Sequence, residues 1–168
     1  NLGGLLATMI GLTGMVTDQA ITLGRFNTRA ARQPFLVPPM PKNFKGRIVL
    51  LVDGLSMSAS ELFAAGLRGN DRVVIVGERT GGQSLPAIWK KLSTGAVMVF
   101  PVADFIAQNG KSLEGVGLQP DHVVAMNRKS LLGGVDPQLQ KALAVASDPS
   151  FFTAQLAAND LPPPAAKP

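Results

Sequence analysis

Three serines, Ser56, Ser58 and Ser60, lie between an aliphatic run and a helical pattern. The run at residues 47–53, Arg-Ile-Val-Leu-Leu-Val-Asp, is typical of a central strand buried on both faces. Residues 54–68 begin as a turn and continue as an amphipathic helix. The start of a helix presents free N–H groups and a positive dipole end to a developing oxyanion. A hydroxyl at this junction is therefore a candidate nucleophile.

The same residues allow a purely structural interpretation. Ser58-Ala-Ser-Glu61 is an S-x-x-E capping box, in which the serine and the glutamate satisfy each other's backbone N–H groups. The local pattern alone favours this capping role, so both interpretations stay open.

The surrounding pattern predicts a layered α/β domain. Residues 72–77 form a second buried strand reached through the helix, so residues 47–77 make a β-α-β unit with a parallel pair. We further expect a buried helix at 3–16, a strand at 21–26, an exposed stretch at 27–46 with a short strand near Phe35, a hairpin at 86–92 and 96–101, a short strand at 123–126, and helices at 136–146 and 151–158.

Composition excludes several classes of protein. The chain has 168 residues, enough for one domain with a real core, and its 16 Lys and Arg against 11 Asp and Glu are dispersed. We therefore expect no nucleic-acid partner. There is no Cys and a single His, so we expect neither a disulfide, a metal site nor another cofactor, and no apolar run is long enough for a membrane span.

Four motifs, in order, resemble those of tail-specific, carboxyl-terminal-processing and tricorn-type serine peptidases. Asn1-Leu-Gly-Gly4 is similar to the end of their Asp-Leu-Arg-x-Asn-x-Gly-Gly segment, and Ser56-Met-Ser-Ala-Ser-Glu61 to their nucleophile segment. Val76-Gly-Glu-Arg-Thr-Gly-Gly82 resembles the turn that follows, and Leu113-Glu-Gly-Val-Gly-Leu-Gln-Pro-Asp121 a late Glu-Gly-x-Gly-x-x-Pro-Asp segment. The ordered set is far more specific than any one motif.

The resemblance implies roles for particular residues. It makes Ser58 the nucleophile and leaves Ser56 and Ser60 structural. The backbone N–H of Ala59, with that of Gly3 or Gly4, would form the oxyanion hole.

The general base is the main departure from the tail-specific pattern. That branch has a lysine where this chain has Gln83, and a neutral amide cannot accept the serine proton. The tricorn-type branch instead uses a histidine from further upstream together with a glutamate at the position of Glu114. Lys90, Lys91 and His122 are weaker candidates, which we expect to be solvated or structural.

The resemblance also implies a ClpP/crotonase-like fold with a mainly parallel sheet, closer to the tricorn and retinoid-binding-protein branch. We expect a peptidase core at 1–158, truncated at its N-terminus, and a flexible Pro-rich tail at 159–168. The expected partners are a peptide or protein substrate and an upstream PDZ or cap region, and the expected location is the bacterial periplasm or envelope. The alternatives are a non-catalytic binding module of the same fold and, less favoured, an acyl-CoA enzyme.

Overall fold

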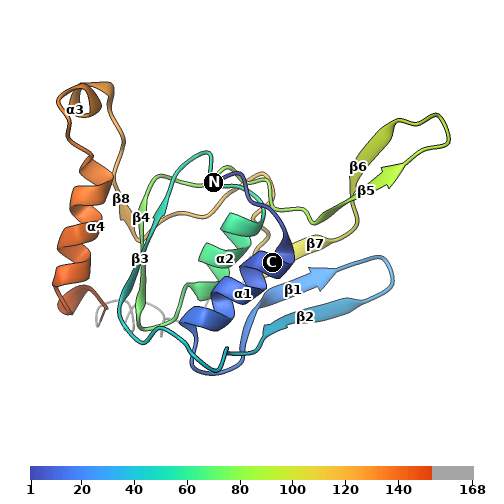
Figure 1. Ribbon diagram of the computed structural model, residues 1–168, viewed down its shortest axis with the longest axis horizontal. Helices are drawn as coiled ribbons and strands as arrows, with labels where there is room; N and C mark the ends of the chain where they lie inside the picture. The colour runs from blue at the N-terminus through green and yellow to red at the C-terminus, as the bar shows by residue number, and fades with distance from the viewer. Residues whose placement is uncertain (153–168) are drawn as a thin grey trace, which may run out of the picture.

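The fold is a mixed α/β arrangement built on three small sheets (Figure 1). The structure is a computed structural model and describes residues 1–152. Only one of the sheets is parallel, with the order β3-β4-β8, so the expected parallel sheet is present but does not dominate. Its strands are β3 (Ile48–Val52), β4 (Val73–Gly77) and β8 (His122–Val123).

The β-α-β unit predicted from the sequence is confirmed. Helix α2 (Ala59–Leu67) connects β3 to β4, and the two strands pair in parallel with Ile48 opposite Val73. Every residue of β4 is buried, as its continuous aliphatic run predicts. The unit therefore places the end of β3 and the start of α2 at the carboxyl edge of the sheet.

Strand β3 differs from its prediction as a central strand. It pairs only with β4 among the described residues, and Leu51 is 45% exposed. The aliphatic run is typical of a buried strand, but the described part of the chain contains no strand on the side of β3 that faces away from β4.

The second sheet is antiparallel, with the order β2-β1-β7. Its strands are β1 (Ile21–Asn27), β2 (Arg32–Val37) and β7 (Asp104–Ala107), and Phe26, Phe35 and Phe105 stack within it. The strands at 21–26 and near Phe35 were predicted, whereas β7 was not, because it is four residues long and is recognised only through its pairing with β1.

The third sheet is the predicted hairpin, formed by β5 (Ala87–Lys91) and β6 (Val97–Pro101). It projects from the body as an arm (Figure 1). Trp89 is 78% exposed on it, so the described residues leave this indole almost uncovered.

Three further helices complete the described chain. Helix α1 (Leu6–Val16) starts later than predicted and buries only Met9, Thr13 and Gly14, so it is a partly exposed covering helix rather than a buried one. Helix α4 (Pro137–Ser147) has the predicted cap, since the Asp136 carboxylate accepts from the Leu139 amide at 2.9 Å. Helix α3 (Arg128–Leu132) was not predicted. The described residues end at 152. The predicted helix from residue 153 to 158 and the whole tail at 159–168 therefore lie outside them.

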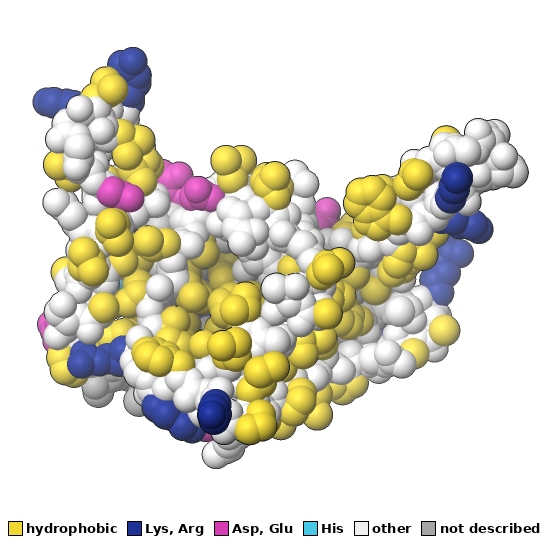
Figure 2. Space-filling model, in the orientation of Figure 1, with side chains coloured by type: hydrophobic (Ala, Val, Ile, Leu, Met, Phe, Trp, Pro, Cys, Tyr) yellow, Lys and Arg dark blue, Asp and Glu magenta, His cyan; other side chains and the backbone are white. Residues whose placement is uncertain are grey.

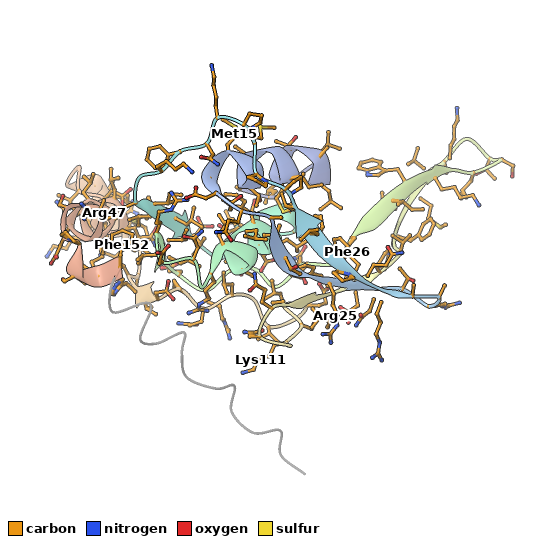
Figure 3. The ribbon with its side chains drawn as sticks, turned by 90° about the horizontal axis from the view of Figure 1, so that it is seen from below. Met15, Arg25, Phe26, Arg47, Lys111 and Phe152 are labelled. Carbon is orange, nitrogen blue, oxygen red and sulfur yellow. The ribbon has the colours of Figure 1, made fainter. Side chains whose placement is uncertain are left out.

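Helices cover both faces of the parallel sheet, which separates the apolar side chains into two clusters. Helices α1 and α2 pack between the two larger sheets, whereas α4 covers the opposite face of β3 and β4 (Figure 1). Arg47 and Phe152 meet beside α4, with the guanidinium carbon 5.6 Å from the ring centroid, and Phe26 lies on the other side of the molecule (Figure 3). The smaller cluster contains Val74, Val76, Val145 and Phe152.

Candidate active site

Ser58 occupies the residue before the first turn of α2 and has an unusual backbone. Its φ is 55° and its ψ is −127°, and it is the only non-glycine residue with a positive φ among residues 1–152. An L residue adopts such angles only at a cost of about 1 to 3 kcal/mol, and such strain is concentrated at functional sites. The predicted strand-to-helix junction is confirmed, with Ser58 as the N-cap residue of α2, and its strain is more than a simple helix cap requires.

Glu61 holds this strained turn in place. Its side chain is fully buried, and its carboxylate accepts from the Ser58 amide at 3.2 Å, the Gly82 amide at 2.8 Å and the Gln83 amide at 2.9 Å. The Thr80 hydroxyl donates to the same carboxylate. Backbone and hydroxyl donors thus replace the water that this carboxylate loses on burial.

Thr80 extends this network to the late glycine-rich motif. Its hydroxyl oxygen accepts from the Leu118 amide at 2.6 Å, and the Gly115 amide donates to the Gly82 carbonyl at 2.8 Å. A side chain at Gly82 would meet the Gly117 amide nitrogen at 2.9 Å. The Glu-Arg-Thr-Gly-Gly turn and the Glu-Gly-x-Gly loop therefore pack backbone to backbone, which requires glycine at the contact.

Gly3 packs directly against the Ser58 turn. Its φ is +88°, and a Cβ there would lie 2.7 Å from the Met57 carbonyl oxygen, 2.7 Å from the Ser58 Cβ and 3.0 Å from the Ala59 nitrogen. The Met57 amide also donates to the Asn1 carbonyl at 3.0 Å. The N-terminal motif and the serine motif, 50 residues apart or more, therefore form one wall of the site.

Glu114 lies against the turn that contacts Ser58. Its carboxylate accepts from the Ser84 amide at 2.6 Å and from the buried Ser84 hydroxyl at 3.4 Å. The Ser58 amide donates to the carbonyl of Gln83, the residue before Ser84, at 2.8 Å. Glu114 is therefore bound to Ser84, the neighbour of the residue that contacts the Ser58 amide, rather than facing bulk solvent.

Gln83, where the resemblance led us to expect a lysine, adjoins the serine through its main chain. Its side chain is exposed, while its amide and carbonyl take part in the Glu61 and Ser58 contacts. The main chain at position 83 therefore belongs to the serine turn, and the side chain does not.

The other residues considered as bases lie elsewhere. His122 belongs to β8 and pairs with Val76 of β4. Its ring meets the Phe151 ring edge-on, with 5.1 Å between the centroids, on the α4 side of the sheet. Burial, with the nearby Lys141 charge, holds the pKa of His122 below its usual value, although Asp121 opposes this. Lys90 and Lys91 are exposed on the hairpin.

A hollow of about 440 Å³ opens beside the serine turn. Its wall includes Gly3, Gly4 and Ala59, and its other lining residues are mostly apolar, with four polar exceptions: Asn1, Thr8, Ser56 and Ser60. Within residues 1–152 no three His, Cys, Asp or Glu side chains are grouped to hold a metal ion. No helix in the same range is long and apolar enough to cross a membrane.

Sequence reasoning missed some of the site. It treated Glu61 only as a capping partner, and it gave no role to Thr80 or Ser84. A polar residue within the Glu-Arg-Thr-Gly-Gly turn was a usable signal, because a buried carboxylate needs donors from a second segment.

Two kinds of comparison with known proteins agree on a family. The family model for peptidase family S41 matches residues 1–124. A carboxyl-terminal-processing protease of Picosynechococcus is 31% identical over 124 residues, covering 74% of this chain but only 30% of the relative. The chain therefore spans about a third of the length of this relative.

Solved structures share the fold at lower identity. A Parabacteroides merdae protein assigned as a peptidase superposes with a TM-score of 0.76 at 21% identity, over 88% of this chain and 50% of that one. The tricorn protease superposes with a TM-score of 0.63 at 22% identity, over 91% of this chain and 14% of that one. The family match over most of the chain, on a mixed α/β fold shared with other peptidases, establishes that this chain belongs to peptidase family S41, a family of serine-type peptidases.

Proposed function

We propose that residues 1–158 are the core of a serine endopeptidase with Ser58 as its nucleophile. The observation that carries the proposal is the strained Ser58 backbone at the start of α2, held by the fully buried Glu61. A strained strand-to-helix turn lifts a serine hydroxyl out of the helix and toward a substrate.

In the proposed reaction the Ser58 oxygen attacks a peptide carbonyl carbon while a general base takes the hydroxyl proton. The negative charge on the carbonyl oxygen is stabilised by the Ala59 N–H and by an N–H from Gly3 or Gly4, which the packing of Gly3 on Ala59 supports. Collapse of this intermediate breaks the C–N bond, and the amine leaves with the proton. Water then hydrolyses the acyl-enzyme.

We further propose that the base comes from outside this chain, in the manner of the tricorn-type branch. Gln83 cannot serve as the base, and Glu114 lies at the adjoining turn, where a carboxylate orients a histidine in a catalytic triad. A ClpP/crotonase-like classification, an upstream PDZ or cap region, and a periplasmic or envelope location belong to the same proposal and rest on resemblance alone.

A non-catalytic binding module of the same fold is the competing function, and the lysine-to-glutamine difference at position 83 favours it. A fluorophosphonate probe separates the two, because it reacts only with an activated serine. We expect the probe to label the full-length protein covalently. In Ser58→Ala, both labelling and peptide hydrolysis should fall by about 10³-fold or more. Ser60→Ala, two residues further along the chain, is the matched control and should retain both. A folded full-length protein that neither labels nor hydrolyses peptides would favour the binding module.

A further inference from the structure

The β5–β6 hairpin exposes apolar side chains on both of its faces. Side chains alternate between the two faces of a strand, and the register pairs Trp89 with Val99. One face therefore carries Trp89, Val97 and Val99, all more than half exposed. The other face carries Ile88 and Met98, which are 46% and 41% exposed. An antiparallel sheet commonly packs one face on a core, whereas the described part of the chain leaves both faces of this hairpin largely uncovered.

Each apolar face of the hairpin also carries one lysine. Lys91 shares the face of Trp89, Lys90 shares the face of Ile88, and both lysines are exposed. Residues 84–103 contain no Asp or Glu, and neither lysine forms an ion pair with a described carboxylate. A lysine can lay its hydrocarbon stem along apolar surface while its ammonium group stays in a polar layer. Both faces of the arm are therefore apolar and positively charged.

The β1–β2 hairpin adds positive charge at the same end of the molecule. Figure 1 and Figure 3 both show its turn pointing to the side toward which the arm extends. Arg25, Arg29 and Arg32 are exposed on it, and residues 19–37 contain no Asp or Glu. Figure 2 shows apolar and basic side chains gathered at this end, on the right of the view. Basic residues that are far apart in the sequence are thus brought together by the two hairpins.

A lipid surface fits these properties better than a protein partner does. A folded protein that docks on a two-stranded ribbon covers one face, whereas the interfacial layer of a bilayer surrounds both. Tryptophan is enriched in this layer, and basic side chains are attracted to anionic head groups. The unpaired backbone edges of the ribbon exclude it from the hydrocarbon interior, where such groups find no partner, but the hydrated head-group region can satisfy them.

We infer that this end of the molecule binds anionic lipid surfaces, with the β5–β6 hairpin lying in the head-group layer. The arginines of the β1–β2 hairpin strengthen the attraction to the same surface. The inference does not depend on the proposed peptidase activity, because Ser58 lies at the start of α2 and neither hairpin contains it. It holds equally for an active enzyme and for a binding module.

Co-sedimentation of the full-length protein with lipid vesicles tests the inference. We expect partitioning into vesicles of phosphatidylglycerol mixed equally with phosphatidylcholine to be at least ~10-fold stronger than into phosphatidylcholine alone, and to weaken in about 0.5 M NaCl. Equal partitioning into the two kinds of vesicle would overturn the inference. Binding to soluble poly-glutamate that is as tight, per negative charge, as binding to the anionic vesicles would also overturn it, and would assign this end to an acidic protein segment.

Trp89 reports whether the hairpin itself makes the contact. It is the only tryptophan in this chain, and the full-length Trp89→Phe protein supplies the blank for any others. We expect brominated lipid in the anionic vesicles to quench the fluorescence that belongs to Trp89 by about half or more, because the indole lies at the depth of the head groups. Vesicle binding without this quenching would place the contact elsewhere and overturn the inference.

A pair of double variants separates the hairpin from net charge. Lys90→Gln with Lys91→Gln removes two exposed cations from the arm, and Arg128→Gln with Lys129→Gln removes two from α3, at the other end of the molecule (Figure 1). We expect the first pair to weaken partitioning into anionic vesicles at least ~10-fold and the second pair by about 2-fold or less. Equal losses would show that only the net charge matters, and an unchanged partitioning of both would show that the arm makes no contact. Either result would overturn the inference.

Discussion

The serine turn and the β5–β6 hairpin are held in opposite ways. The serine turn is fixed by a buried carboxylate with four donors from two segments of the chain, Ser58 and residues 80–83. The hairpin has its own strand pairing and a mostly exposed surface, including Trp89 at 78%. A two-stranded hairpin alone is marginally stable in water, whereas a satisfied buried network is rigid. The difference indicates that precise positioning is concentrated at Ser58 and that the hairpin is free to adapt.

The largest effect that we expect, and the strongest test of this comparison, is the loss of stability in Glu61→Ala. The change leaves four donors facing an apolar interior and should reduce the free energy of unfolding by about 3 to 5 kcal/mol. Denaturant unfolding measures it. Glu78→Ala is the control, because Glu78 is half-buried and accepts from one backbone amide, that of Met126 at 2.8 Å. A loss no larger for Glu61 than for Glu78 would contradict the assigned role of the network.

A smaller effect on stability but a large one on activity is expected for Gly3→Ala. The new Cβ would meet the Ser58 Cβ at 2.7 Å and must move the nucleophile turn. We expect about a 10²-fold drop in fluorophosphonate labelling or peptide hydrolysis of the full-length protein, as a displacement near 1 Å produces. Gly110→Ala carries the same kind of backbone cost, since Gly110 has φ +78° with nothing near its Cβ. It should lose stability by about 1 kcal/mol with activity unchanged. Equal activity losses would show that backbone strain alone is responsible.

For the hairpin we expect the opposite result, a substitution with little effect on stability. Trp89→Ser should change Tm of the folded protein by about 2 °C or less, because the indole is already in solvent. Thermal unfolding followed by circular dichroism measures it. A loss of several degrees in the full-length protein would mean that another region covers the arm there, and the contrast between the two regions would no longer hold.

The smallest effect that we expect is on the pH dependence of stability, through His122. Its pKa is lowered in the folded protein mainly by burial, so the unfolded chain binds more protons as pH falls below about 6.5. Its neutral form is the one the fold favours. Stability is therefore full above that pH and declines as pH falls toward the lowered value. His122→Gln should flatten the dependence of Tm on pH between about 7 and 5. An unchanged slope would assign the dependence to other groups.

The local chemistry of the site was predictable from the sequence, and its assembly was not. The aliphatic run at 47–53 and the S-x-x-E pattern located Ser58 at a strand-to-helix junction, because hydrophobic periodicity and capping are local properties. The hairpin and the Asp136 cap were predictable for the same reason. Strand β7 was not predicted, because a segment of four residues is recognised as a strand only through its pairing with β1.

The sequence by itself determined that a serine stands where a helix starts, that position 83 is a glutamine, and which motifs follow in which order. Only the tertiary structure decided that Glu61 is the hub of the turn, that Glu114 rests on Ser84, and that β3 has an open edge. The reason is physical. Whether a carboxylate is buried or solvated, and whether a strand is central or at an edge, depends on which distant segments pack beside it, and no local pattern encodes that packing.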